Sequence, residues 1–125
     1  MYSLDKLEVY QEAMNVGEKI WQIVDKWNFF SKDTMGKQVV KSADSIAANI
    51  SEGYGRYHYR ESIVFYYYSR GSLMETITWV TKAKNRNMIP EQVFSELSIQ
   101  LETLNKKLNG YINYVESLKT SDKIK

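Results

Sequence analysis

The stretch FSELSIQLETLNKKLNGYINYVESL, residues 94–118, carries the clearest pattern in the chain. Its apolar residues recur at alternating steps of three and four: Phe94, Leu97, Leu101, Leu104, Leu108, Tyr111, Val115 and Leu118. That spacing places them along one side of an α-helix. It predicts a long amphipathic helix over about residues 90–118, which begins at Pro90, a residue suited to a first helical turn. The polar residues 119–125 are expected to fray.

Three earlier segments show the same helical period, over about residues 5–28, 34–52 and 57–86. Asp5 and Glu8 have the spacing of a capping box, which predicts the start of the first helix. Residues 29–33 interrupt the period and are expected to form the first connection. No stretch alternates as a strand does. The sequence therefore predicts an all-α fold, an up-down-up-down four-helix bundle that occupies residues 1–125 as one domain.

Composition excludes several classes of site. The 125 residues include no cysteine and one histidine, which excludes disulfides, thiolate nucleophiles and most zinc or di-iron sites. Lys and Arg number 17 against 15 Asp and Glu, a balance too mild to indicate nucleic-acid binding by itself. No apolar run is long enough to cross a membrane, and the N-terminal residues lack the pattern of a secretory signal. We expect a cytoplasmic protein with no membrane partner.

The helix over residues 57–86 has two apolar faces, whereas a bundle helix needs only one. We expect one face to be buried in the bundle: Ile63, Tyr67, Arg70, Met74, Ile77 and Thr81. We expect a single chain to leave the other face bare: Phe65, Tyr68, Ser72, Thr76, Trp79 and Ala83. An exposed aromatic stripe usually marks an interface, so this pattern predicts self-association. In an unusually broad bundle the same stripe would instead be internal.

The first helix shows a milder version of the same feature. Its apolar arc is widened by five residues: Leu7, Tyr10, Met14, Gly17 and Trp21. The predicted oligomer interface combines residues of the two helices: Tyr10, Met14, Trp21, Phe65, Tyr68, Ser72 and Trp79.

Two glycines follow the second helix, in the string Gly53-Tyr54-Gly55. Glycine just past a helix end is typical of a left-handed C-terminal cap. A phosphate-binding loop is the alternative, but no strand precedes the string and the third glycine of a dinucleotide fingerprint is absent. The pattern therefore favours a helix stop.

Arg70 lies on the face that we expect to be buried, so its guanidinium needs a partner. Three side chains suit by type: Glu52, Glu75 and Asn49. The sharper alternative is an arginine that anchors a substrate. Gly71, next to it in mid-helix, is typical of a position where another backbone approaches closely.

Basic residues gather in two places. One cluster, with an adjacent tyrosine, lies near the second connection: Arg56, Tyr57 and Arg60. The other lies at the far end of the third helix: Lys82, Lys84 and Arg86. Tyrosine beside arginine suits single-stranded nucleic acid, because rings stack on bases and guanidinium groups contact phosphate. The alternative is a solvated connection whose tyrosines pack on neighbouring helices.

The pattern does not predict an enzyme. The one histidine, His58, lies in a connection, where a surface or capping role is more common than catalysis. Glu52 and Glu61 lie beside Arg56 and Arg60, which favours ion pairs over a pair of catalytic carboxylates. No Glu-x-x-His pair, activated serine or phosphate loop occurs. We expect no catalytic residue, metal, cofactor or small-molecule substrate.

The run from Asn49 to Arg56, NISEGYGR, together with Leu7-Glu8-Val9-Tyr10 and Arg70-Gly71-Ser72-Leu73-x-Glu75, resembles a known family. This is the bacterial four-helix-bundle family named for the intervening sequences of 23S ribosomal RNA. The chain is also similar to the accessory protein of diversity-generating retroelements. The matching positions are Asn49, Glu52, Gly53, Gly55, Arg56, Glu61, Arg70, Gly71, Ser72 and Glu75. His58 departs from the family, which often has Ser or Thr as the cap before the third helix.

The resemblance implies a bundle that assembles into a ring, typically of five subunits. The functional hypothesis is therefore a non-enzymatic, homo-oligomeric interaction protein. The alternative is an RNA- or DNA-binding ring, associated with ribosomal RNA or a reverse transcriptase through the basic, tyrosine-rich connections.

Overall fold

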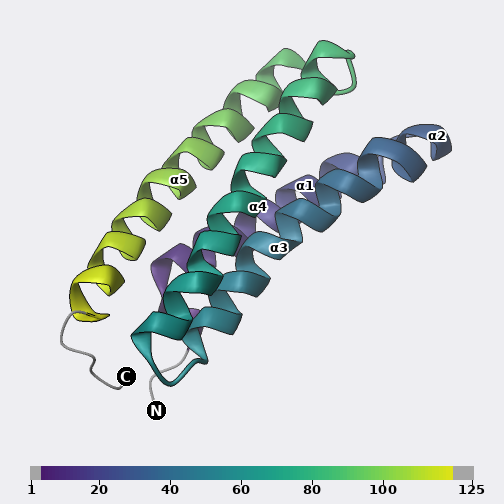
Figure 1. Ribbon diagram of the computed structural model, residues 1–125. Helices are drawn as coiled ribbons and strands as arrows, with labels where there is room; N and C mark the ends of the chain where they lie inside the picture. The colour runs from purple at the N-terminus through teal and green to yellow at the C-terminus, as the bar shows by residue number, and fades with distance from the viewer. Residues whose placement is uncertain (1–3, 120–125) are drawn as a thin grey trace.

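The computed structural model describes residues 4–119, which form four long helices and no strand (Figure 1). A short 3-10 turn, η1 (Leu4–Lys6), precedes α1 (Glu8–Asp25). The second long helix is continuous and has three parts: α2 (Phe29–Ser31), a π-helical turn η2 (Lys32–Gly36) and α3 (Lys37–Tyr54). Helices α4 (Tyr59–Asn85) and α5 (Glu91–Lys119) complete the bundle. The predicted all-α, up-down-up-down four-helix bundle is confirmed.

The helices form two antiparallel pairs, α1 with α3 and α4 with α5 (Figure 1). The pairs pack together over most of their length and diverge toward the end that carries α2. The buried side of α5 follows the predicted seam through Leu97, Leu101, Leu104, Leu108 and Val115, with Ile112 added. One hydrophobic cluster draws residues from all four helices.

The predicted buried face of the third helix is wrong. The side of α4 that faces the core carries eight buried residues: Ser62, Ile63, Tyr66, Ser69, Leu73, Thr76, Val80 and Ala83. Of the expected face, only Ile63 is buried, and Tyr67 and Met74 are 39% and 42% exposed. Small hydroxyl residues alternate with large ones on the true core side, so its apolar signal is weak. Hydropathy alone therefore favoured the wrong stripes.

Hydroxyl hydrogen bonds explain how α4 packs so closely on α3. The Ser69 hydroxyl donates to the backbone oxygen of Ile46 at 2.8 Å, and the hydroxyls of Ser42 and Thr76 are 2.9 Å apart. The Thr76 hydroxyl also donates to the backbone oxygen of Ser72 at 2.9 Å. These bonds satisfy buried polar atoms between the helices, so small polar residues can take the place of apolar ones.

The first connection is shorter than predicted. Residues 29–33 are helical, because Asn28 caps the second helix: its Oδ1 accepts from the Ser31 backbone N–H at 2.9 Å. At the other end of the molecule, α1 begins after Leu7, not in a capping box. The Glu8 carboxylate instead pairs with Lys107 of α5 at 2.6 Å. The residues predicted to fray begin with Lys119, which ends α5, and residues 120–125 lie outside the described part of the chain.

The glycines at the end of α3 do not form the predicted left-handed cap, since no described glycine has a positive φ. Gly53 is buried inside the last turn of the helix, and Gly55 has φ −78°. A β-carbon at Gly53 would lie 2.6 Å from Cε1 of Tyr66 and 2.9 Å from the backbone oxygen of Ser62. Gly53 is therefore needed for the close approach of α4 to α3.

Candidate interaction surfaces

The outer side of α4 carries an uncharged hydrophobic surface, which we call the α4 face: Val64, Tyr67, Tyr68, Gly71 and Met74. The four large side chains are 41%, 39%, 57% and 42% exposed, in chain order. Between Glu61 and Glu75 the sequence has one charged residue, Arg70, and its side chain turns toward α5. A Cβ at Gly71 would meet nothing within 4 Å, so the predicted close approach of another backbone does not occur within this chain.

The seam predicted to stay bare is mostly covered by the fold. Thr76 and Ala83 are buried, and Trp79 packs on the core while its Nε1 donates to the Glu75 carboxylate at 3.1 Å. Ser72 donates to the Ser45 hydroxyl at 3.1 Å. Phe65 is partly covered by the Arg56 guanidinium, 4.5 Å from its ring centre. The expectation of a bare seam is therefore wrong for these residues, and among its members only Tyr68 is well exposed.

Arg70 lies at the edge of the groove between α4 and α5 and not in the core. Its Nη1 donates to Oδ1 of Asn109 at 3.2 Å, and its guanidinium lies 5.1 Å from the ring centre of Tyr67. The three expected partners, Glu52, Glu75 and Asn49, are engaged elsewhere. The Tyr67 hydroxyl donates to Glu116 at 2.6 Å, and this hydrogen bond raises the pKa of Tyr67.

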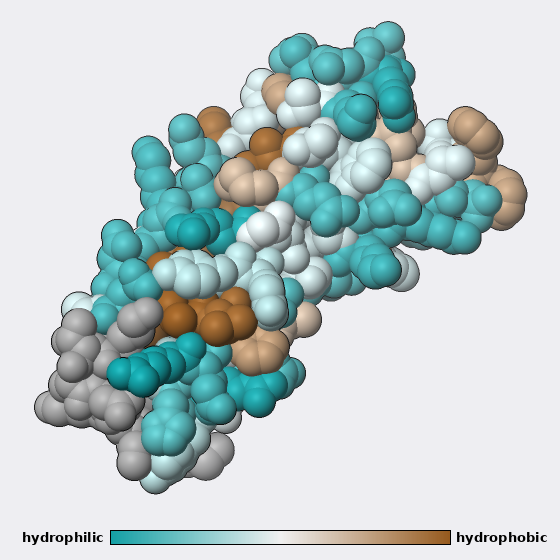
Figure 2. Space-filling model, in the orientation of Figure 1, coloured by the Kyte–Doolittle hydropathy of each residue, from teal (hydrophilic) through white to brown (hydrophobic). Residues whose placement is uncertain are grey.

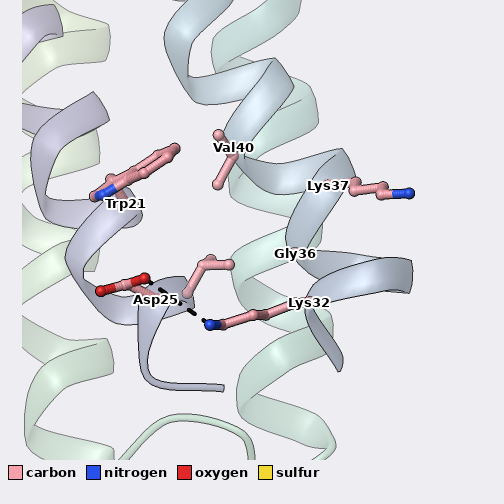
Figure 3. A pocket seen from close by; sticks show the side chains of 7 residues that line it. Trp21, Asp25, Lys32, Gly36, Lys37 and Val40 are labelled. Atoms are coloured by element: carbon pink, nitrogen blue, oxygen red, sulfur yellow. Dashed lines mark ion pairs between the residues drawn. The ribbon is translucent and has the colours of Figure 1, made fainter. Parts of the chain in front are cut away.

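A second surface, the α1–α3 groove, runs between those two helices. At the end nearer α2, a hollow of about 220 Å³ lies between Trp21 of α1 and Val40 of α3 (Figure 3). An ion pair between Asp25 and Lys32, 3.9 Å apart, closes that end. Farther along the same helices, a hollow of about 350 Å³ is lined by Tyr10 and Met14. Met14 and Trp21 are 45% and 56% exposed, and their place in an oligomer interface stays a prediction.

Two carboxylates, Asp44 of α3 and Glu18 of α1, line the wider hollow. Neither carboxylate forms an ion pair or a hydrogen bond among the described residues. Burial raises the pKa of Asp44, and the charge of Glu18 raises it further. Gly17 allows this arrangement, because a β-carbon there would lie 2.9 Å from Asp44 Oδ1. The hollow therefore holds negative charge that no ion pair within residues 4–119 neutralises.

Figure 2 shows a third hydrophobic area at the tip of the molecule that carries α2. Phe29 and Phe30 are 80% and 74% exposed there, the highest values among the large hydrophobic residues described. Both residues were predicted to lie in a connection, and this surface was not predicted. Two adjacent phenylalanines beside a helix-capping Asn28 were the available signal.

The two basic clusters lie at opposite ends of α4, which separates Arg60 from Lys82 by about 33 Å. Arg56 pairs with Glu52 at 2.7 Å, Lys84 lies 3.7 Å from Glu91, and Arg86 contacts the sulfur of Met35 at 2.9 Å. Tyr57 is 60% exposed. Arg60, Lys82 and Arg86 form no ion pair in residues 4–119, and of these three only Arg86 has a side-chain hydrogen bond, the one to Met35.

Within residues 4–119, no group of three His, Asp or Glu side chains could hold a metal ion. None of the helices in this range is long and apolar enough to span a membrane.

Three of the positions that carry the family resemblance, Asn49, Gly53 and Ser72, lie where α3 meets α4. Asn49 donates to the backbone oxygen and the hydroxyl of Ser45, at 2.9 and 3.0 Å, and Ser72 bonds the same hydroxyl from α4. Gly53 admits the ring of Tyr66. A family model described as 23S rRNA-intervening sequence protein matches residues 5–110. The chain belongs to this family.

The fold of this intervening-sequence family member is also found in a solved structure. A protein of unknown function from the S23 ribosomal protein family of Bacteroides thetaiotaomicron is similar, with a TM-score of 0.75 and 20% identity. The match covers 83% of this chain and 97% of that one. At this identity the likeness shows the fold. The chain matches no curated protein.

Proposed function

We propose that this intervening-sequence family protein is a non-enzymatic, homo-oligomeric interaction protein that closes into a ring of five copies. The single observation that supports self-association is the α4 face, where the uncharged residues Val64, Tyr68 and Met74 lie exposed around Gly71. A contiguous apolar patch of this kind on a small protein usually marks an interface. The number five rests on the family resemblance.

The ring is tested by measuring the molar mass in solution. Light scattering at micromolar concentration is expected to give five times the chain mass of 14.7 kDa. A monomeric mass would overturn the proposal of self-association, and another stable multiple would overturn the number five.

The α4 face is tested by a matched pair of substitutions. Tyr68→Glu places a charge on the α4 face, and we expect it to lower the mass while the helical circular dichroism is retained. Tyr114→Glu changes a residue of the same type and similar exposure on α5, 59% against 57%, and is expected to keep the wild-type mass. If Tyr68→Glu keeps the wild-type mass, the α4 face is not the contact.

Binding of single-stranded RNA or DNA is a second candidate. One observation favours it: the exposed ring of Tyr57 lies close in sequence to Arg60, a cation with no ion pair among residues 4–119. Labelled single-stranded RNA is titrated at low and moderate salt against wild type and an Arg56→Glu, Arg60→Glu double variant. Binding that weakens with salt and is lost in the variant would support this candidate. No binding at low salt would contradict it.

A further inference from the structure

The α1–α3 groove combines apolar walls with uncompensated negative charge. Trp21 and Val40 line its hollow nearer α2, and Asp44 and Glu18 line the next hollow along the same two helices. The other charged groups of the groove, Asp25, Lys32 and Lys37, lie in the first hollow, where Lys32 pairs with Asp25 and Lys37 with Asp33. An occupant should therefore place a cation at Asp44 and apolar groups beside Val40.

The N-terminal half of α4 has this combination. Arg60 is exposed and unpaired among the described residues, and it lies at the start of the α4 face. Val64 follows four residues later, and Tyr67 and Tyr68 follow on the next turn. At 3.6 residues per turn, Arg60, Val64 and Tyr67 lie on the same side of the helix.

We propose that the α1–α3 groove of one copy receives the N-terminal half of α4 from a second copy, with Arg60 against Asp44 and Glu18. This contact deepens the proposed function, on which it rests, by naming the two surfaces that meet. They are different surfaces, and in the proposed ring the contact is head-to-tail, the kind that closes a ring when the rotation allows it.

The spacing of the two surfaces fixes the register. In a ring whose rotation axis runs along the bundle, α3 of one copy and α4 of the next are antiparallel, because they are antiparallel within each chain. With Arg60 at Asp44, Val64 then lies opposite Val40. Val64 is four residues after Arg60 in α4, and Val40 is four residues before Asp44 in α3. The same count sets Met74 opposite Phe30. In these two pairs, apolar residues of one copy meet apolar residues of the other.

Lys82, the other exposed cation of α4 with no ion pair among the described residues, does not fit in this orientation. If Lys82 lay at Asp44 in the same antiparallel register, residues further along the chain, Lys84, Asn85 and Arg86, would lie toward Val40. Polar and basic groups would then face the apolar hollow. The shape of the groove agrees with a helix as occupant, because its floor at the carboxylates is built from small residues: Ala13, Gly17, Ala47 and Ala48. Arg60 is therefore the cation whose charge and register both fit the position at Asp44.

A charge swap tests the contact in the full chain. Asp44→Lys and Arg60→Glu, made singly, each put like charges together, and we expect each to raise the dissociation constant of the assembly at least about tenfold. The combined variant, Asp44→Lys with Arg60→Glu, restores an opposite pair and is expected to recover most of the wild-type affinity. Restoration also shows that neither single variant fails because it is unfolded.

Two matched controls change charges outside the contact. Lys82→Glu reverses the other unpaired cation of α4, and Glu102→Lys reverses an exposed carboxylate of α5, and both are expected to keep the wild-type dissociation constant. If the double variant associates no better than the single variants, or if Lys82→Glu rescues Asp44→Lys instead, the assignment is overturned. If single variants associate like wild type, this contact fails while the oligomer stands. A monomeric wild type overturns the proposed function itself.

A mixing experiment tests whether the groove of one copy meets the α4 face of another. Asp44→Lys retains an intact α4 face, and Arg60→Glu retains an intact groove. In a 1:1 mixture, the Lys of one variant and the Glu of the other can meet only if groove and α4 face belong to the same contact. We expect the mixture to form assemblies larger than either variant alone. No increase in mass would contradict a contact between these two surfaces.

Discussion

The ring of Tyr66 lies directly against the backbone of Gly53, with no room for a side chain between them. A β-carbon at residue 53 would lie 2.6 Å from Cε1 of a ring that is fully buried. Tyr66 in turn packs edge-on against Tyr111 of α5, with ring centres 5.1 Å apart. This contact joins α3, α4 and α5 at one end of the bundle.

Gly53→Ala is therefore expected to destabilise the fold by about 1–3 kcal/mol, the usual cost of overpacking a core. Chemical denaturation followed by circular dichroism measures this change. Gly55→Ala is the control, because a β-carbon there would find its nearest neighbours at 3.6 and 3.7 Å, which is ordinary contact. Equal stability of the two variants would show that Tyr66 can move away from Gly53 without cost.

Asn28 sets the start of the second long helix through the bond from the Ser31 N–H to its Oδ1, at 2.9 Å. Asn28→Ala removes this cap and should cost about 1 kcal/mol of unfolding free energy. Asn28→Asp keeps an acceptor at the same place and should retain most of the stability. The expectation fails if Asp and Ala at this position are equally destabilising.

The hydroxyls of Ser42 and Thr76 bond across the α3–α4 contact at 2.9 Å, and both residues are buried. Thr76→Val replaces one hydroxyl with a methyl group of similar size and leaves Ser42 without this partner, at a cost of roughly 1–3 kcal/mol. Adding Ser42→Ala should cost less than it does in the wild type, because the bond is already lost. A double-mutant cycle with additive effects would show that the two hydroxyls are not coupled.

The raised pKa of Tyr66 predicts how the stability of the fold depends on pH. Burial raises its pKa far above the ordinary value of 10.0, and the hydrogen bond with Tyr111, whose hydroxyl is 3.5 Å away, adds to this. The folded chain therefore keeps the Tyr66 proton after the unfolded chain has lost it. Its contribution to stability is constant below pH 10 and falls above it by about 1.4 kcal/mol per pH unit.

Tyr66→Phe removes this titration, so its unfolding free energy should fall less steeply above pH 10 than that of wild type. Denaturation curves at several alkaline pH values measure the slope. Tyr57→Phe changes an exposed tyrosine and should keep the wild-type slope. A wild-type slope in Tyr66→Phe would mean that other groups account for alkaline unfolding.

The long helices followed from apolar spacing, and α5 best of all, because its buried positions are Leu, Ile and Val at regular steps. Apolar spacing predicts the ends of helices less well. The first helix stops at Asp25 and the second already begins at Phe29, and the π-helical turn at Lys32–Gly36 then adds a residue to the turn, so the period of the second helix becomes regular only after its first residues. Sequence spacing cannot distinguish such a turn from a connection between helices.

Some residues of the candidate surfaces could be predicted from the sequence and others could not. Met14, Trp21 and Tyr68 were predicted to lie at the surface from the width of their apolar arcs, and they are exposed. Arg70 and Trp79 were misplaced, because the apolar stripes of α4 do not coincide with its buried side. The shared position of Asp44 and Glu18 in one hollow was not predicted, since the two residues belong to different helices and no motif marks the place.

The sequence alone determined that the chain forms four helices, because amphipathic periodicity is a local property that each segment carries by itself. Only the tertiary structure decided which side of α4 is buried. There, serine and threonine hydroxyls find partners on α3, and Gly53 makes room for Tyr66, so polar residues become interior while Val64, Tyr68 and Met74 stay outside. Burial of a polar atom depends on a partner that is distant in sequence, which no hydropathy pattern contains.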